Sequence, residues 1–175
     1  PRVLEGLDAA LETLPGPIKV NVVSMRGHTE QEVVAFARLA RQRGLTVRFI
    51  EFMPLDADQN WQRDQVLTGA EVRKIIAEHF PIEPVDQGDS HAPSQDWRFT
   101  DAPGGLGFID SVSAPFCESC DRVRLTADGR LRTCLFSVGE TDLRGPLRDG
   151  ASDGQLAAII QAAVWHKQPG HRIDE

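Results

Sequence analysis

The sequence predicts an α/β protein in which strand–helix units are followed by antiparallel strands. Helical and strand patterns alternate over residues 1–85, and the strand patterns from residue 97 onward are joined by short turns, as in β-hairpins. A third observation sets the size: 175 residues, 41% of them hydrophobic, are enough for one domain with a core and a small appendage.

The first helix is predicted up to residue 14, because apolar side chains recur at helical spacing and a Pro-Gly-Pro turn follows. No strand precedes it, as in the middle of a β/α series whose earlier units are absent. A buried strand is predicted over 18–25, with Lys19 and Asn21 on one face. Lys19 either extends to the end of the strand or points into a barrel towards a ligand, and the pattern leaves both open.

The next helix is predicted from Thr29 to Gly44, because Thr29-x-x-Glu32 has the pattern of a capping box and Gly44 is a helix stop. A strand follows over 46–53, and its alternation gives one face to Phe49, Glu51 and Met53. Strand, helix and strand within so short a segment predict a βαβ unit with parallel strands. Parallel barrels place their chemistry at the carboxyl ends of the strands.

A polar loop is predicted over 56–67. A second capping box, Thr68-x-x-Glu71, opens a helix with one apolar face, which prolines end before residue 85. Residues 86–95 are rich in turn formers, and we interpret His91 in this segment as a surface residue rather than a metal ligand.

Antiparallel strands are predicted over 97–100 and 106–112. A second hairpin runs out over 123–126, turns at an Ala-Asp-Gly sequence and returns over 130–135. The remaining predicted elements are a short helix over 142–148 and a last helix that Ser152-x-x-Gln155 caps.

The three cysteines are the most specific chemical signal, with the spacing C-x2-C-x13-C over Cys117, Cys120 and Cys134. Two thiols can reach one metal from a tight turn, and the hairpin brings the third back. A closed zinc site needs four ligands, whereas a cubane iron–sulfur cluster with three can leave one iron open to a substrate. The spacing alone leaves zinc, iron–sulfur and a disulfide with one free thiol open. His166 or His171 could complete a zinc site, although a histidine at a helix end is favoured simply by the helix dipole.

Two arginines follow the second cysteine directly. Arg122 and Arg124 alternate along the outgoing strand, which predicts both guanidinium groups on one face. Guanidinium groups bind phosphate oxygens bidentately, so the pattern favours a phosphorylated ligand beside the metal. The alternative is a solvated arginine pair on a hairpin edge. The net charge of −7 argues against broad nucleic-acid binding and favours a small anionic ligand.

No run of residues approaches the ~18 apolar residues of a membrane span, and the first residues lack the pattern of a signal peptide. We therefore expect a cytoplasmic protein without a membrane partner. Reduced thiols in that compartment favour metal binding over a disulfide.

The stretch Phe-Cys-Glu-Ser-Cys-Asp-Arg-Val-Arg-Leu-Thr-Ala-Asp-Gly-Arg-Leu-Arg-Thr-Cys-Leu-Phe, residues 116–136, resembles the second-cluster motif of the GTP 3′,8-cyclases. These are radical S-adenosylmethionine enzymes of molybdenum cofactor biosynthesis, which convert GTP to (8S)-3′,8-cyclo-7,8-dihydroguanosine 5′-triphosphate. The resemblance implies a C-terminal [4Fe-4S] cluster whose open iron contacts the guanine of GTP. It assigns the cluster to Cys117, Cys120 and Cys134, and GTP to Arg122 and Arg124.

Two further stretches, Ile-Lys-Val-Asn-Val-Val and Arg-Phe-Ile-Glu-Phe-Met-Pro, resemble the family's fifth and sixth barrel strands. They imply that Lys19 contacts GTP and that Met53 contacts S-adenosylmethionine. The implied fold is the C-terminal part of an incomplete TIM-type (β/α) barrel with an antiparallel cluster-binding extension. Residues 1–85 would be the last β/α units of a radical S-adenosylmethionine partial barrel, and residues 86–175 the region of the auxiliary cluster and GTP.

The sequence departs from the family pattern at both ends. The family binds its first cluster through C-x3-C-x2-C and ends in Gly-Gly, but no cysteine precedes Cys117 and no Gly-Gly follows Glu175. We therefore expect a C-terminal portion of the enzyme, inactive alone, with the first [4Fe-4S] cluster on the missing N-terminal part. No catalytic residue is assigned in this chain.

The partners that the resemblance implies are GTP, a second copy in a homodimer and the next enzyme of the pathway. Two other interpretations stay open. One is a non-catalytic zinc-binding structural module. The other is a different radical S-adenosylmethionine enzyme that has an auxiliary cluster and a peptide substrate, which would not require Arg122 and Arg124.

Overall fold

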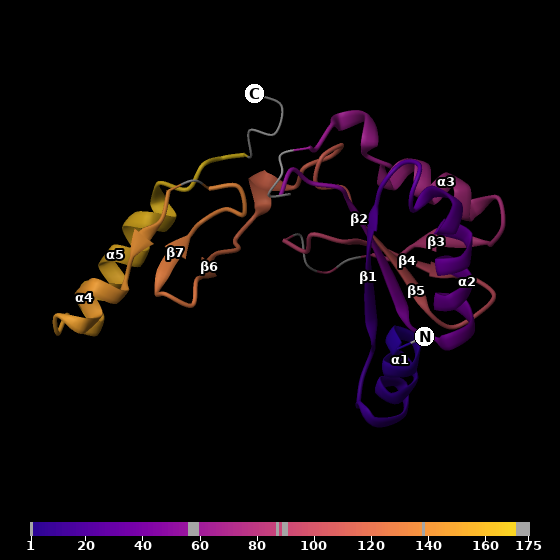
Figure 1. The fold of residues 1–175 in the computed structure, drawn as a ribbon, viewed down its shortest axis with the longest axis horizontal. Coiled ribbons are helices and arrows are strands. Elements are labelled where there is room, and N and C mark those ends of the chain that lie inside the picture. The colour runs from indigo at the N-terminus through magenta and orange to yellow at the C-terminus, as the bar shows by residue number, and fades with distance from the viewer. Residues whose placement is uncertain (1, 56–59, 87, 89–90, 138, 171–175) are drawn as a thin grey trace. The chain divides into compact units, whose positions relative to one another are not determined.

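The computed structural model describes residues 2–55, 60–86, 88, 91–137 and 139–170 (Figure 1). The chain divides into two compact units, Pro1–Pro115 and Phe116–Glu175. The first unit extends past residue 85 because two further strands join its sheet. The functional division at residue 85 stays a prediction.

The first unit is built on a five-stranded mixed sheet in the order β1-β2-β5-β4-β3 (Figure 1). Strands β1, β2 and β5 are parallel, whereas β3 and β4 are antiparallel to their neighbours. This mixture confirms the α/β class and the predicted hairpin. The strands are β1 (Lys19–Ser24), β2 (Thr46–Glu51), β3 (Ile82–Pro84), β4 (Gln95–Phe99) and β5 (Gly105–Ile109).

The helices of the first unit begin and end close to the predicted residues. The second capping box is confirmed, because the Thr68 hydroxyl accepts from the Glu71 amide and the Glu71 carboxylate accepts from the Thr68 amide. Gly44 ends a helix in the left-handed region at φ 65°, as the sequence predicts. The helical elements are α1 (Arg2–Thr13), η1 (Glu30–Glu32), α2 (Val33–Arg43), η2 (Arg63–Gln65) and α3 (Gly69–Ala77).

The capping box predicted at Thr29 is wrong. The Thr29 hydroxyl makes no cap hydrogen bond and instead donates to the carbonyl oxygen of Val23, at 2.6 Å. It also accepts from the amide of Met25, at 3.3 Å. The side chain is buried against the end of β1, so the chain enters α2 through the 3-10 turn η1.

The core of the first unit lies between one face of the sheet and helices α2 and α3. Phe49 of β2 stacks on Phe108 of β5 with ring centroids 6.0 Å apart. Burial of these apolar side chains is the main stabilising contribution to the unit. The buried cluster comprises Val22, Val33, Ala37, Ala40, Leu45, Val47, Phe49, Leu67, Val72, Ile76, Phe99, Leu106 and Phe108.

The second unit contains a small antiparallel sheet in the order β6-β7-β8. Its first two strands are the predicted second hairpin, with Gly129 at φ 82° in the turn. The last helix has its predicted capping box between Ser152 and Gln155. The elements are η3 (Cys117–Ser119), β6 (Arg124–Leu125), β7 (Arg130–Arg132), β8 (Thr141–Asp142), α4 (Arg144–Arg148) and α5 (Asp153–Trp165).

Among the helices that the structure describes, none has the length and apolar character that crossing a bilayer requires.

Candidate functional site

The segment 116–122, called the cysteine loop here, begins the second unit. Its 3-10 turn η3 is closed by a hydrogen bond of 3.2 Å from the Cys120 amide to the Cys117 carbonyl oxygen. Cys134 follows strand β7. All three cysteines are free thiols and half-buried, which leaves them accessible to a ligand.

Arg122 folds back onto the cysteine loop. Its Nη2 donates to the Sγ of Cys120 at 3.2 Å, and its guanidinium carbon lies 4.7 Å from the ring centroid of Phe116. Burial of the Cys120 thiol raises its pKa. The hydrogen bonds and charge of Arg122, with a smaller effect of Lys167, outweigh burial and hold the pKa below its ordinary value. These contacts favour the thiolate form of Cys120, the form in which a cysteine binds a metal.

The two arginines do not alternate along one strand as the sequence suggested. Arg122 precedes β6, and only Arg124 lies in that strand, where it is exposed. The structure therefore brings Arg122 together with Cys120, whereas Arg124 is an exposed residue of the hairpin.

The donor set fits an iron–sulfur cluster by its chemistry. Three thiols, one with a lowered pKa, are the ligands that such clusters use. Within the described residues, no group of three or more His, Cys, Asp or Glu side chains lies close enough to hold a single metal ion. A cubane is larger than one ion, so its thiolates lie further apart than the ligands of zinc.

Of the three histidines considered as ligands, two are exposed and the third is not among the residues that the structure describes. His166 is exposed, with its Nδ1 2.7 Å from the carbonyl oxygen of Ala162 in the last turn of α5. His91 is exposed. His171 lies outside the described residues.

In the first unit, Lys19 and Asn21 lie on the sheet face opposite the core and are exposed. Arg48 of β2 is paired in register with Asn21 and shares that face. The Nε of Arg48 is buried and has no hydrogen-bond partner among the residues that the structure describes, which is unusual for a charged group. Sequence reasoning missed Arg48, because its place on the face of Lys19 and Asn21 depends on the register of β1 and β2.

Gly107 makes room for Arg48 on this face. It pairs with Arg48 across β2 and β5, and a Cβ there would lie 2.9 Å from the Arg48 Cγ and 2.5 Å from the Ser94 Oγ. Any other residue at this position would have to displace both of these side chains.

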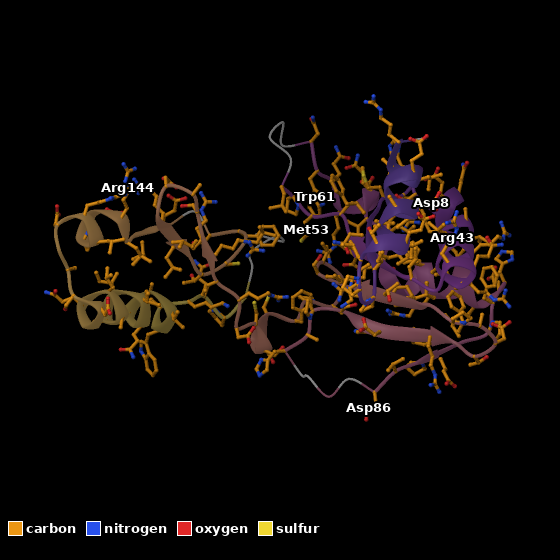
Figure 2. The ribbon with its side chains drawn as sticks, turned by 90° about the horizontal axis from the view of Figure 1, so that it is seen from below. Asp8, Arg43, Met53, Trp61, Asp86 and Arg144 are labelled. Atoms are coloured by element: carbon orange, nitrogen blue, oxygen red, sulfur yellow. The ribbon has the colours of Figure 1, made fainter. Side chains whose placement is uncertain are left out.

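Met53 lies two residues beyond the end of β2 and is half-buried (Figure 2). The chain turns there, with a hydrogen bond of 2.8 Å from the Leu55 amide to the Met53 carbonyl oxygen. The indole Nε1 of Trp61 donates to the carbonyl oxygen of Phe52 at 2.8 Å. These contacts hold the backbone on both sides of Met53.

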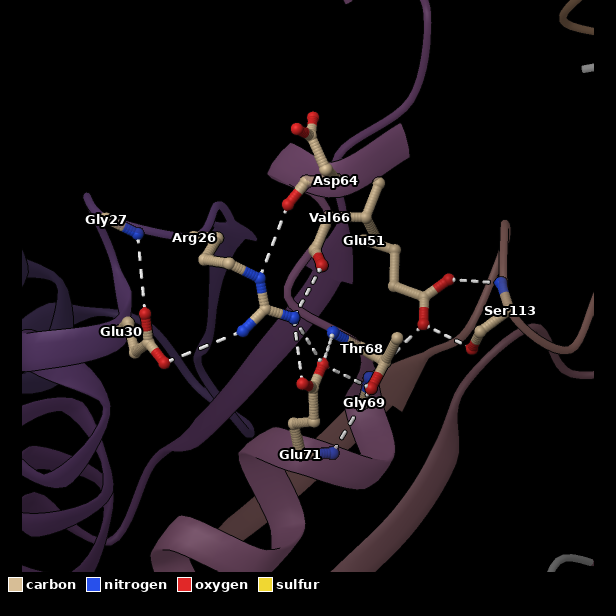
Figure 3. A network of polar contacts seen from close by, with 10 residues as sticks. All are labelled: Arg26, Gly27, Glu30, Glu51, Asp64, Val66, Thr68, Gly69, Glu71 and Ser113. Carbon is tan, nitrogen blue, oxygen red and sulfur yellow. Dashed lines mark hydrogen bonds and ion pairs between the residues drawn. The ribbon is translucent and has the colours of Figure 1, made fainter. Parts of the chain in front are cut away.

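Glu51, the last residue of β2, has a carboxylate that forms hydrogen bonds to the start of α3 and to the segment after β5 (Figure 3). The Oε2 accepts from the amides of Val112 and Ser113, both at 2.7 Å. The Oε1 accepts from the Ser113 hydroxyl at 2.5 Å and from the Gly69 amide at 3.2 Å. Glu51 is only 1% exposed, so these bonds replace its hydration and fix the carboxyl end of the strand.

Beside Glu51, Arg26 donates through Nη2 to both carboxylate oxygens of Glu71, at 2.8 and 2.9 Å (Figure 3). This bidentate pair lowers the pKa of Glu71 to about 2. Both residues line a pocket of about 610 Å³ at the carboxyl end of the parallel strands, where α/β proteins bind ligands. The other lining residues are Arg63, Asp64, Val66, Thr68, Val112 and Ser113.

The fold and the cysteine loop define a class: an α/β protein whose second unit carries three free, half-buried thiols. The chain belongs to the Molybdenum Cofactor Synthesis C family, whose model matches residues 45–173. It is 42% identical to a GTP 3′,8-cyclase of Corynebacterium glutamicum (strain R), in an alignment of 178 positions that covers 99% of this chain and 47% of that protein.

Two other curated relatives have the same printed name. The chain is 43% identical to the GTP 3′,8-cyclase of Rhodopirellula baltica, over 99% of this chain and 49% of that protein. It is 42% identical to that of Mycolicibacterium smegmatis, over 100% of this chain and 50% of the relative. The chain therefore spans about half the length of the curated relatives it matches, and the family resemblance drawn from the motifs is confirmed.

Proposed function

We propose that this chain is the C-terminal portion of a GTP 3′,8-cyclase and supplies its substrate-binding cluster and part of its GTP site. The observation that carries the proposal is the cysteine loop, in which Arg122 donates to the Sγ of Cys120, in a chain similar over its whole length to proteins of that name. In this role the enzyme converts GTP to (8S)-3′,8-cyclo-7,8-dihydroguanosine 5′-triphosphate for molybdenum cofactor biosynthesis.

The cysteines Cys117, Cys120 and Cys134 would hold a [4Fe-4S] cluster as thiolates. When bound, the cluster would supply an open iron to which the guanine of GTP can attach. The lowering of the Cys120 pKa by Arg122 favours the deprotonated ligand.

The phosphates of GTP would be held by the basic side chains that the sequence singled out, Lys19, Arg122 and Arg124. The guanidinium group of Arg122 has five N–H donors. It stacks on Phe116 and donates from Nη2 to Cys120, so its other donors would be available for a phosphate. We add Arg48 to this set, because it lies on the same sheet face as Lys19 and its buried Nε has no hydrogen-bond partner within the described part of the chain.

Met53 would contact S-adenosylmethionine from the carboxyl end of β2, where Glu51 and Trp61 hold the neighbouring backbone. The chain's residues would thus bind and orient the two substrates, and their fixed positions would account for the protein's share of catalysis. The first cluster would lie on another part of the enzyme.

The finer assignments belong to the same proposal. The mixed sheet would be the end of an incomplete TIM-type barrel, with residues 1–85 in the barrel and residues 86–175 in the cluster and GTP region. We further propose a cytoplasmic enzyme that acts as a homodimer and passes its product to the next enzyme of the pathway.

Anaerobic reconstitution tests the metal assignment. The chain should bind about four irons and four sulfides, with the charge-transfer absorption of a cubane. One zinc per chain without that absorption would instead support the structural zinc module. The reconstituted chain alone should release no 5′-deoxyadenosine from S-adenosylmethionine, because the first-cluster cysteines are not in it.

Arg124→Ala tests the phosphate site with GTP and guanosine as paired ligands of the reconstituted protein. The variant should lose about 1.5 to 3 kcal/mol of GTP binding, the range for a hydrogen bond to a charged group. Guanosine binding should not change, because the nucleoside offers the arginine no phosphate. Arg148→Ala, an exposed arginine on α4 of the same unit, is the matched control and should leave both affinities unchanged. Equal loss of both ligands in Arg124→Ala would contradict the phosphate site.

A further inference from the structure

Lys167 lies close to the cysteine loop, although it follows Cys120 by 47 positions in the sequence. Its Nζ donates to the carbonyl oxygen of Cys120 at 2.5 Å and to that of Arg122 at 3.0 Å. The same Nζ lies 3.5 Å from the Sγ of Cys120. An ammonium group has three N–H donors, so these three acceptors account for all of them.

The end of α5 fixes the position of Lys167. The helix ends at Trp165, and the Lys167 amide donates to the carbonyl oxygen of Val164 at 3.0 Å. The side chain is half-buried, which strengthens a charged hydrogen bond relative to one in water. The backbone of α5 thus holds the ammonium group against the loop.

We propose that Lys167 is a positioning residue for the cluster that Cys117, Cys120 and Cys134 would hold, an inference that rests on the proposed function. By binding two carbonyl oxygens on either side of Asp121, the ammonium fixes the backbone that carries the Cys120 thiolate. Partners of a metal ligand outside its coordination sphere orient the ligand and tune the metal in this way.

The charge of Lys167 has a second effect. A positive charge beside the Cys120 sulfur stabilises the more negative, reduced form of a bound cluster, and so raises its reduction potential. Arg122 contributes a second positive charge at the same sulfur. Removal of either charge should therefore lower the potential, whereas a purely structural contact would leave the potential where it is.

The first test uses the metal-free chain. Lys167→Met keeps a side chain of similar length and removes the charge and all three donors. Amide hydrogen exchange at Cys120 should become about tenfold faster, because loss of hydrogen bonds to a charged group releases the turn. Lys74→Met, an exposed lysine on α3, is the matched control and should leave exchange in the loop unchanged. Unchanged exchange at Cys120 in Lys167→Met would overturn the proposal whichever metal the chain binds.

The second test uses the reconstituted chain, an iron chelator and a redox titration. Lys167→Met should lose iron about 10- to 100-fold faster, the usual effect of removing a partner of a metal ligand. Its midpoint potential should fall, whereas Lys167→Arg, which keeps the charge, should stay near the unaltered value. Equal potentials in Lys167→Met and the unaltered chain would overturn the charge effect.

Failure of the proposed function is visible separately. It would appear as zinc, or no iron, in the unaltered chain, and in that case the exchange measurement still decides whether Lys167 holds the loop. If the unaltered chain takes up four irons and Lys167→Met retains them equally long, only the inference about Lys167 fails.

Discussion

The buried carboxylate of Glu51 allows the stability of the first unit to be tested by one substitution. In Glu51→Gln the side chain keeps its shape, but one carboxylate oxygen becomes an NH2 group that cannot accept. If the amide oxygen stays with the Gly69 amide and the Ser113 hydroxyl, the amides of Val112 and Ser113 lose their acceptor. Val112 is buried, and a buried donor without a partner costs about 1–3 kcal/mol. Ser113 is exposed, so water can take the place of the lost acceptor at its amide and adds little to this cost.

Urea unfolding followed by tryptophan fluorescence measures this loss. Of the three tryptophans, Trp165 lies in the second unit and is 88% exposed, so a Trp165→Phe background confines the signal to the first unit. With a slope of about 2 kcal/mol per M, a cost of about 1–3 kcal/mol should lower the midpoint of Glu51→Gln by roughly 0.5–1.5 M. The slope itself should not change, because the surface exposed on unfolding is the same.

Glu83→Gln is the control for loss of a carboxylate charge. Glu83 also accepts from an arginine, Arg98, but both side chains are largely exposed, and such a pair contributes about 0–1 kcal/mol. Its midpoint should therefore shift by less than about 0.5 M. If the midpoint of Glu51→Gln shifted no further than that of Glu83→Gln, the hydrogen bonds of the Glu51 carboxylate would not stabilise the first unit as the structure indicates.

Three further outcomes are expected. Because the pKa of Glu71 is lowered from 4.5 to about 2, its ionised carboxylate stabilises the folded state at pH values above 4.5. This contribution is lost as the pH falls from 4.5 towards about 2. Arg26→Met removes the main cause of the shift, so acid titrations should show a smaller loss of stability over that pH range. Gly69→Ala should unfold well before the unaltered chain in thermal scans, because its Cβ would lie 1.8 Å from the Oδ1 of Asp110. Ser152→Ala should cost about 1 kcal/mol in urea unfolding of the second unit, by loss of the helix cap.

The helix starts show which contacts a sequence pattern can predict. Thr68 and Ser152 cap their helices as predicted, because a capping box joins residues three positions apart. Thr29 has the same pattern but donates to Val23, an acceptor that the preceding strand and turn bring back to it. Local spacing cannot show such a competing partner.

Short strands were missed for a related reason. Strand β3 has three residues and β8 has two, which is too short for an alternating pattern to be recognised. Each is a strand because a neighbouring strand supplies its hydrogen bonds. The longer β4 and β5 were predicted as a hairpin, but their attachment to β2 depends on pairing that is distant in sequence.

Some residues of the candidate site can be found from local sequence spacing, and others only from contacts between distant parts of the chain. The spacing of the cysteines is a local property, so all three could be found without a structure. The importance of Arg48 follows from its register with Asn21 and Gly107, and that of Lys167 from contacts with a loop far earlier in the chain. Residues of these common types at such positions have no distinctive pattern, so only the structure indicates them.

Arg122 and Arg124 look equivalent in the sequence, but the structure gives them different roles and hence different expected effects. Arg122 donates to the Cys120 sulfur and stacks on Phe116, whereas Arg124 is exposed in β6. Arg122→Ala should therefore lower both GTP affinity and retention of iron against a chelator, because one guanidinium contacts the thiolate and, as proposed, the phosphate. Arg124→Ala should lower GTP affinity alone. Iron retention that is equal in the two variants would show that the Arg122–Cys120 contact does not stabilise the site.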